Sequence, residues 1–267
     1  MIPKVIHYCW FGGKDLPQSA IKCIESWKKY CPDYEIKRWD ESNFDVCSHP
    51  YTKEAYETKK WAFITDYVRL YALVTEGGIY MDTDVEVIKP LTPFLQHEAF
   101  SGFESESEIP TGIMACKKEF ELFKMFLAEY DDRHFLINNE MDLTTNVITI
   151  TNKCMELGLQ KNNKFQIING FVLYPKDFFC PKNYKTGDID VTENTVAIHH
   201  FDGTWLPKRT KMWNDFERAC RIKGGKTITK WLDSRWCEIL HRIFERDFRA
   251  NIRKAKEKLK KAFKLWI

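Results

Sequence analysis

A long helical pattern that ends at a glycine pair, with a short apolar stretch directly after it, constrains the fold of this chain more than any other feature. From Lys59 to Thr75 the apolar residues recur at helical spacing, and Gly77-Gly78 ends the pattern. Residues 79–81 are apolar and predict a buried strand. A helix that leads at once into a strand is a unit of α/β proteins, so we expect that class.

The same alternation of strands and helices recurs along the chain. Helical patterns begin at Pro17 and at about Glu119, and strand-like segments lie at residues 5–10, 34–39, 99–103, 112–116, 171–174 and 196–200. This alternation predicts a mostly parallel central sheet with nucleotide-binding character. Ligands of such sheets bind beyond the carboxyl ends of the strands, where Trp10, Asp82 and His200 fall.

Composition narrows the class of protein further. The chain has 44% hydrophobic and 30% charged residues, which is typical of a globular protein. Its nine cysteines are odd in number and form no Cys-x-x-Cys pair, which argues against a disulfide framework or a zinc ribbon and favours a reducing cytosol. No segment approaches the roughly 20 apolar residues of a membrane span. We therefore expect a cytoplasmic protein that is soluble or peripheral to a membrane.

Two carboxylates, Asp82 and Asp84, follow the strand one residue apart. Alternate residues of a strand share a face, so the two would repel each other unless a cation lay between them. Mg²⁺ and Mn²⁺ take few protein oxygens and complete their shells with phosphates and water. The spacing therefore indicates a metal–phosphate bridge, with a solvated turn as the alternative interpretation.

The helix before the glycine pair carries Asp66 and Arg69, which are three residues apart and so lie on one side of it. One interpretation is a surface ion pair, which would add little to stability. Because the helix is otherwise apolar and leads directly to Asp82, the other interpretation is a ligand site. A carboxylate can bind ribose hydroxyls, and a guanidinium can bind a diphosphate.

A second polar cluster occupies residues 197–205. A histidine at a strand end can add a nitrogen ligand to a metal held by carboxylates, although most lone histidines are core residues. His199 and His200 fall on opposite faces of a strand, which leaves one buried and one available. Trp205 can donate its indole N–H to a phosphate or pack against the protein.

Four ordered blocks within residues 2–210 resemble the DXD-containing, sugar-binding glycosyltransferases of family 32. The blocks are residues 6–13, 60–69, 77–84 and 199–205. The family includes bacterial capsule and lipopolysaccharide enzymes. It is similar to yeast mannosyltransferases of the Och1 type and, more distantly, to the glucosyltransferase domains of clostridial toxins.

The resemblance implies a GT-A type fold, a nucleotide-sugar donor, Mn²⁺ or Mg²⁺, and transfer with retention at the anomeric carbon. It implies that Trp10 stacks on the nucleobase and that Asp66 contacts the ribose and the donor sugar, with Arg69 beside it. It also implies that Asp82 faces the ribose and the sugar, whereas Asp84 binds the metal directly.

The late block departs from the toxin pattern. The toxin loop offers a carboxylate and a hydroxyl, whereas related retaining enzymes use a histidine followed by an aromatic residue. The pair His200-Phe201 suits the second pattern. It makes His200 the expected metal ligand and puts Thr204 or Trp205 near the diphosphate.

The chemistry of sugar transfer agrees with these assignments. A divalent ion, Arg69 and the Trp205 N–H would stabilise charge on the diphosphate, while the sugar passes through an oxocarbenium-like state. No second carboxylate is evident as a nucleophile, so we expect same-face attack by the acceptor hydroxyl with the leaving phosphate as base. Sugar contacts are expected in a polar stretch, and the choice stays open among Asn138, Asn139, Glu140, Asp142 and Asn146.

The carboxyl-terminal part differs in charge from the rest. The segment 223–226 contains a glycine pair and predicts a boundary between a GT-A domain at 1–222 and a basic helical region at 226–267. From Arg242 onward there are ten Lys or Arg against three Asp or Glu, with apolar residues at helical spacing. Attachment to an anionic membrane and packing on the enzyme both explain this pattern, and nucleic acid is not an expected partner.

These observations together predict a metal-dependent, retaining hexosyltransferase. The expected donor is a nucleotide-sugar, UDP-linked rather than GDP-linked by resemblance, and the expected acceptor is a glycan or a lipid-linked oligosaccharide in surface polysaccharide assembly. The alternatives are a toxin-like effector that sugar-modifies a protein and a nucleotide-sugar-binding protein without activity. The intact Asp82/Asp84 pair argues against the last of these.

Overall fold

The computed structural model describes residues 1–204, 206 and 208–232. The chain forms two compact units. The first contains residues 1–182 and 189–202, and the second contains residues 183–188 and 203–267. The predicted site residues Trp10, Asp66, Arg69, Asp82, Asp84 and His200 all belong to the first unit.

Most elements of the first unit coincide closely with the segments predicted from the sequence. In chain order they are β1 (Val5–Cys9), α1 (Gln18–Tyr30), β2 (Glu35–Trp39), α2 (Pro50–Glu57), α3 (Trp61–Glu76), β3 (Gly78–Met81), β4 (Val85–Val87), β5 (Ala99–Gly102), β6 (Ile113–Cys116), α4 (Glu121–Ala128), β7 (Leu136–Ile137), β8 (Glu140–Met141), α5 (Asn146–Glu156), β9 (Gln166–Ile168), β10 (Phe171–Tyr174) and β11 (Ala197–His199). The second unit contains α6 (Lys208–Leu232).

The main sheet has seven strands in the order β2-β1-β3-β6-β5-β10-β9. Five of them run in one direction, while β6 and β9 pair antiparallel with their neighbours. The predicted α/β class with a mostly parallel central sheet is therefore confirmed. Two small antiparallel pairs, β4 with β11 and β7 with β8, complete the strands of the described residues.

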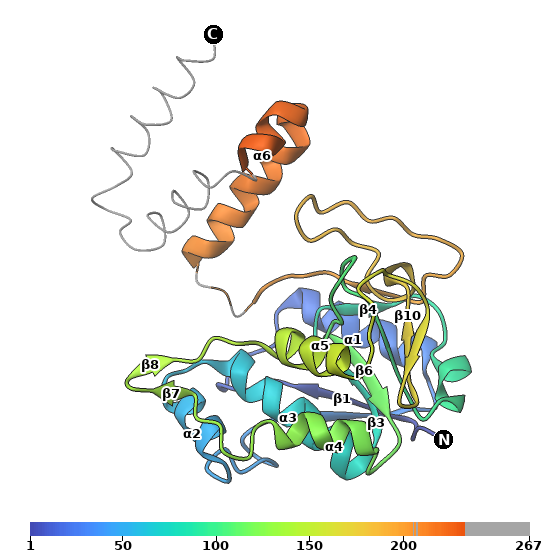
Figure 1. Cartoon of the computed structure of the whole chain (residues 1–267), viewed down its shortest axis with the longest axis vertical. Helices are drawn as coiled ribbons and strands as arrows, with labels where there is room; N and C mark the ends of the chain where they lie inside the picture. Colours follow the sequence, from blue (N-terminus) through green and yellow to red (C-terminus); the bar gives the residue numbers. More distant parts are fainter. Residues whose placement is uncertain (205, 207, 233–267) are drawn as a thin grey trace. The chain divides into compact units, whose positions relative to one another are not determined.

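Helices cover both faces of this sheet. Figure 1 shows α3 and α4 on one side of the strands and α1 on the other. The central strand β3 serves both sides, because Tyr80 belongs to the hydrophobic cluster around α3 while Ile79 and Met81 belong to the cluster around α1. Burial on both faces explains why this short strand is apolar throughout.

The glycine pair fixes the junction between α3 and β3. Both glycines have positive φ, +69° at Gly77 and +112° at Gly78. A Cβ at Gly77 would lie 2.5 Å from the Lys118 backbone nitrogen, and one at Gly78 would lie 2.7 Å from the Val5 carbonyl oxygen. Only glycine lets the helix turn this closely into the sheet.

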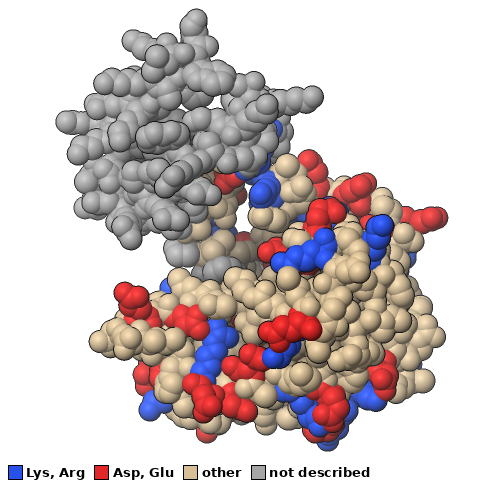
Figure 2. Space-filling model, viewed as in Figure 1, with Lys and Arg blue, Asp and Glu red and all other residues tan. Residues whose placement is uncertain are grey.

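Acidic and basic side chains are interspersed on the face of the first unit that Figure 2 displays. Eight of the nine cysteines lie among the described residues, and none of these eight forms a disulfide. Within the described part of the chain, no helix is both long and apolar enough to cross a membrane.

The predicted boundary at 223–226 lies within α6, which continues through Gly224 and Gly225. The division into domains at 1–222 and 226–267 stays a prediction. Trp205 and residues 233–267, which include the basic segment from Arg242 onward, lie outside the described residues.

Candidate active site

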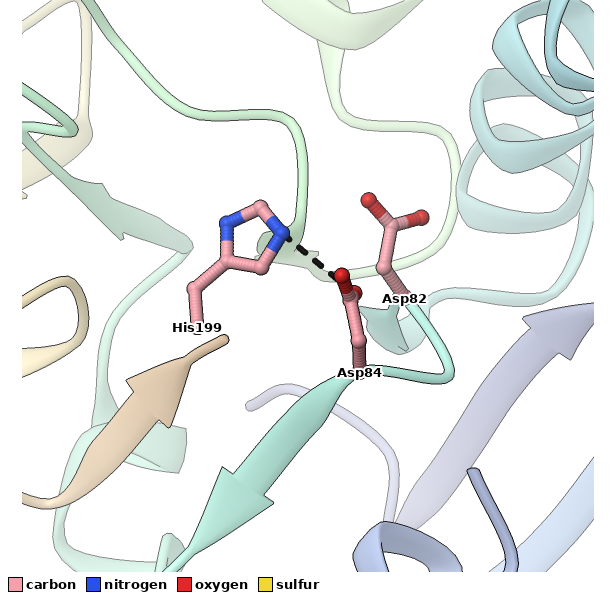
Figure 3. A group of neighbouring side chains, drawn as sticks. All are labelled: Asp82, Asp84 and His199. Atoms are coloured by element: carbon pink, nitrogen blue, oxygen red, sulfur yellow. Dashed lines mark ion pairs between the residues drawn. The ribbon is translucent and has the colours of Figure 1, made fainter. Parts of the chain in front are cut away.

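The two aspartates lie in the turn between β3 and β4. The strand β3 ends at Met81, and the backbone N–H of Val85 donates to the Asp82 carbonyl oxygen at 3.0 Å. The expectation that both aspartates sit on one strand face is wrong, because β4 leaves the main sheet to pair with β11 and the chain must turn between them. The turn still brings the two carboxylates together (Figure 3).

His199, at the end of β11, completes a group with the two aspartates. One ligand atom from each of Asp82, Asp84 and His199 lies within 4.8 Å of the others, and His199 Nε2 is 3.3 Å from Asp84 Oδ1. Figure 3 shows the imidazole and the Asp84 carboxylate pointing toward each other. The antiparallel pairing of β11 with β4 places His199 there.

The choice of His200 as the histidine of this group is therefore corrected to His199. The His200 ring turns to Glu86, with 2.9 Å between His200 Nε2 and Glu86 Oε2. A shift of one residue in strand register moves a side chain to the opposite face, so adjacent histidines cannot be told apart without the pairing. Burial, at 8% exposure for His199, is the signal that separates them.

The Asp84 carboxylate is held by the segment 199–202. Its Oδ2 accepts the Asp202 backbone N–H at 2.9 Å, and its backbone oxygen accepts the His200 N–H at 2.9 Å. Burial alone would raise the pKa of Asp84, but the charge of His199 and the hydrogen bonds from His199 and the Asp202 N–H outweigh it and lower the pKa to about 2. Burial would lower the pKa of His199, but pairing with Asp84 raises it well above 6.5.

Asp82 belongs to a second cluster centred on Arg69. The guanidinium Nη2 lies 3.2 Å from Asp66 Oδ1 and 3.4 Å from Asp82 Oδ1, and Nη1 donates to the Thr111 carbonyl oxygen at 2.6 Å. The guanidinium also lies over the Tyr80 ring at 4.7 Å, and the Tyr80 hydroxyl donates to Asp82 Oδ1 at 2.7 Å. The surface-pair interpretation is excluded, because Arg69 and Asp66 are 5% and 6% exposed.

Asp66 lies against the first turn of α5. Its Oδ2 accepts the backbone N–H of Asn146 at 3.2 Å, and its backbone oxygen accepts the Asn146 side-chain amide at 2.6 Å. Burial raises the pKa of Asp66 to about 6, although Arg69 opposes the shift. Asp66 and Arg69 therefore lie together as the sequence predicted.

Asn146 is thus removed from the expected sugar contacts, because it is fully buried. Asp142 Oδ2 lies 2.8 Å from Arg133 Nη2. Asn138 and Asn139 form the exposed tip of the β7–β8 hairpin, with φ of 52° and 65°. Glu140 is exposed on β8. None of these four residues shares a recorded hydrogen bond or ion pair with Asp66, Asp82 or Asp84 among the described residues.

The structure does not test the roles of the three remaining predicted residues. Trp10 follows β1, the parallel neighbour of β3, and donates its indole N–H to the Lys14 carbonyl oxygen at 2.6 Å. Thr204 is exposed and belongs to the second unit. Trp205 lies outside the described residues, so the roles predicted for Trp10, Thr204 and Trp205 stay predictions.

Sequence reasoning missed Glu104, a carboxylate just beyond β5. Burial raises the pKa of Glu104, and its charge interacts with those of His199 and Asp82. Its backbone N–H donates to the Glu108 carbonyl oxygen at 2.7 Å, which closes a tight loop. The sequence did offer one signal, because Glu104 directly follows a predicted strand. Since β5 runs parallel to β3, the carboxyl ends of both strands lie at the same edge of the sheet.

The donors near the aspartates fit a divalent cation. Two carboxylates and an imidazole converge, and carboxylate oxygens are the ligands that Mg²⁺ and Mn²⁺ prefer. Asp82, Asp84 and His199 are the residues that would hold the ion, and its remaining positions would be open to phosphate and water.

Comparison with known proteins agrees with this site. Residues 17–101 match the family model described as "Glycosyltransferase sugar-binding region containing DXD motif". The matched segment includes Asp66, Arg69, Asp82 and Asp84, so the resemblance predicted from the sequence is confirmed.

Two curated relatives align with parts of the chain. Inositol phosphoceramide mannosyltransferase 3 of Schizosaccharomyces pombe is 32% identical over 121 residues, which are 44% of this chain and 34% of that protein. Subversion of eukaryotic traffic protein A of Legionella pneumophila is 22% identical over 182 residues, 54% of this chain and 27% of that protein. The chain therefore spans about a third or less of the length of these two relatives.

A solved structure of the galactosyltransferase LgtC in complex with donor and acceptor sugar analogs is 17% identical to this chain. It covers 85% of this chain and 94% of its own, with a TM-score of 0.40.

Proposed function

We propose, from the premise that this chain carries the DXD-containing sugar-binding region of glycosyltransferases, that the protein transfers a sugar from a nucleotide-sugar donor to an acceptor hydroxyl. The observation that carries the proposal is the convergence of Asp82, Asp84 and His199 beside the Asp66–Arg69 pair. These groups gather where β3 ends, and carboxyl ends of parallel strands are the usual ligand position in α/β sheets.

The residues of the site have different roles in this reaction. Asp66 accepts hydrogen bonds from hydroxyls of the ribose and the donor sugar, and Asp82 faces the same part of the donor. Arg69 acts mainly through these two aspartates, since its guanidinium already contacts both of them and the Thr111 carbonyl. Trp10 stacks on the nucleobase beyond β1. A Mn²⁺ or Mg²⁺ ion held by Asp82, Asp84 and His199 would neutralise charge on the leaving diphosphate.

We propose retention at the anomeric carbon. The acceptor hydroxyl attacks on the face from which the diphosphate leaves, and the hydroxyl proton passes to the departing phosphate oxygen. The fixed charges of the site are arranged before the reaction begins, which is the arrangement that stabilises an oxocarbenium-like state most effectively.

For the donor we propose a hexose linked to UDP, with GDP-mannose as the first competitor because the S. pombe relative is named as a mannosyltransferase. For the acceptor we propose a glycan or a lipid-linked oligosaccharide of surface polysaccharide assembly. An acceptor borne on lipid would agree with a cytoplasmic protein that binds the inner membrane face through residues 242–267.

A second candidate function is sugar modification of a host protein. The observation that favours it is the similarity to the Legionella protein whose name refers to subversion of eukaryotic traffic. The two functions share the donor site and differ in the acceptor, so acceptor screening separates them.

The decisive assay is release of nucleoside diphosphate from UDP- and GDP-hexoses with Mn²⁺, Mg²⁺ or EDTA. We expect turnover of one donor, loss of turnover in EDTA, and a loss of at least about 100-fold in Asp84→Ala. Glu86→Gln is the matched control, because Glu86 lies two residues away and pairs with His200 instead. If no donor is turned over and Asp84→Ala binds nucleotide as the wild type does, the enzyme proposal is wrong.

A further inference from the structure

The buried side chain of Asn146 connects α5 to the donor-binding aspartate. Asn146 is the first residue of α5 and is 0% exposed. Its side-chain amide donates to the Asp66 carbonyl oxygen at 2.6 Å, its backbone N–H donates to Asp66 Oδ2 at 3.2 Å, and its Oδ1 accepts the Tyr130 hydroxyl at 2.6 Å. Donor and acceptor atoms of the amide are both engaged within the protein, so the side chain has no surface to offer a sugar.

Tyr130 completes the hydrogen bonding of this amide. A primary amide can rotate by 180° and exchange its oxygen and nitrogen, but the Asp66 carbonyl only accepts, so the amide nitrogen must face it. The Tyr130 hydroxyl then donates to the amide oxygen and holds the amide in that orientation. The Tyr130 ring is itself held by packing. It makes edge-to-face contacts with Tyr51 and Tyr67, with ring centroids 4.9 Å and 5.5 Å apart.

The Asp66 carboxylate keeps acceptor capacity after these contacts. Its Oδ1 has Arg69 Nη2 at 3.2 Å, and its Oδ2 has the Asn146 N–H. A carboxylate has about four lone-pair positions, so roughly two remain for hydroxyl donors. The negative charge also lies at the amino terminus of α5, where the helix dipole stabilises it.

We propose that Asn146 and Tyr130 are positioning residues that hold Asp66 in the orientation in which it binds the donor. This inference rests on the proposed function, since it assigns the support of the donor site. Arg69 fixes the carboxylate from its own helix, and the backbone N–H of Asn146 fixes it from the start of α5. The Asn146 side chain, bonded to the Asp66 carbonyl and to Tyr130, holds that N–H in place. The two supports together restrict the rotation of the Asp66 side chain.

The first test is steady-state kinetics of Tyr130→Phe with the nucleotide-sugar that the wild type turns over. The substitution removes one hydroxyl and keeps the packed ring. We expect KM for the donor to rise about 3- to 10-fold, the range for one hydrogen bond, with little change in kcat. A merely structural role would lower the active fraction and so reduce kcat at unchanged KM, which would overturn the inference.

Asn146→Ala extends the test, and we expect a larger rise in donor KM than for Tyr130→Phe. Asn152→Ala is the matched control, because Asn152 is an exposed asparagine on the same helix. If Asn146→Ala does not fold, Tyr130→Phe still decides. A control that raises donor KM equally would assign the effect to α5 as a whole and overturn the inference.

A double-mutant cycle separates positioning from an independent contact. If Tyr130 acts through Asp66, Tyr130→Phe has no further effect on donor KM in an Asp66→Ala background. Additive effects would show that Tyr130 acts independently of Asp66 and would overturn the inference alone. Absence of turnover by the wild type on every donor would overturn the proposed function, and this inference with it.

Discussion

The two aspartates of the Asp-x-Asp pair have different kinds of support. Asp82 is held by Arg69 and Tyr80, which come from the helix and strand directly before it in the sequence. Asp84 is held by His199 and by the backbone of Asp202, which arrive from the far end of the first unit. One support is local in the sequence, and the other depends on a long-range strand pairing.

This difference separates the roles of the two carboxylates. The Arg69 cluster contains one cation between two carboxylates and a carbonyl, so it is arranged before any ligand binds. Asp84, His199 and the backbone of Asp202 form a second group, the Asp84 cluster. Both carboxylate oxygens of Asp84 have protein partners there, and the pKa of His199 is raised. A cation that binds there must compete with the proton on His199, so we expect metal binding to release a proton.

Among substitutions that test the difference between the two supports, Arg69→Met is expected to have the largest effect. The substitution leaves Asp66 buried without its cation and removes the donor to Thr111, so we expect about 3–5 kcal/mol loss of unfolding free energy and no measurable turnover. Urea denaturation measures the first quantity. Lys37→Met is the control, because the Lys37–Glu76 pair is part-exposed and should contribute about 1 kcal/mol or less. Equal stability of the two variants would contradict a preformed Arg69 cluster.

The second prediction concerns which histidine belongs to the Asp84 cluster. We expect His199→Ala to weaken Mn²⁺ binding by at least about 10-fold, the lower end of the effect of perturbing metal-site residues. His200→Ala should bind Mn²⁺ nearly as the wild type does, because its ring pairs with Glu86. Titration of Mn²⁺ by electron paramagnetic resonance measures both. The reverse result would restore His200 as the ligand.

The contrast between the two clusters also explains what the sequence could predict. Asp66 and Arg69 are related by helix periodicity, and the glycine pair fixes how that helix meets β3, so their association followed from local rules. The α/β class and most strand positions followed in the same way. His199 depended on the register of β11 against β4, which no local pattern specifies. Asn146 and Glu104 lie in segments whose approach to the site is set by packing between distant elements.

Gly112→Ala should disturb the Asp84 cluster without replacing any of its ligands. A Cβ at Gly112 would lie 2.7 Å from His199 Cε1, so the ring must shift. We expect a loss of about 1–3 kcal/mol in unfolding free energy, as for overpacking, together with weaker Mn²⁺ binding and lower turnover. Gly158→Ala is the control, because Gly158 has φ of +101° and no neighbour within 4 Å, so it adds backbone strain alone. Unchanged Mn²⁺ binding in Gly112→Ala would contradict the tight packing of His199.

The smallest expected effect is a pH dependence of the unfolding free energy that arises at His7, which contacts the carboxyl end of α3. His7 is fully buried in β1, where its Nδ1 accepts the Trp39 indole N–H at 3.1 Å. Its Nε2 must then carry the proton and donate to the Gly77 carbonyl oxygen at 2.8 Å, at the end of the helix that supplies Asp66 and Arg69. Protonation would place a second hydrogen on Nδ1 and break the bond from Trp39.

Burial lowers the pKa of His7 below 6.5, although the Gly77 carbonyl opposes the shift. A group whose pKa is lower in the folded state stabilises the fold above the unfolded value and loses that contribution as pH falls through the folded value. The stability advantage of the wild type over His7→Gln should therefore be constant at pH 7 and above. Below about pH 6.5 it should shrink by up to about 1.4 kcal/mol per pH unit. Urea denaturation of both proteins between pH 5 and 8 measures the difference, which cancels the titration of Asp66 and His199. A difference that stays constant with pH would mean that His7 tolerates a charge, and that the end of α3 is held by packing rather than by this hydrogen bond.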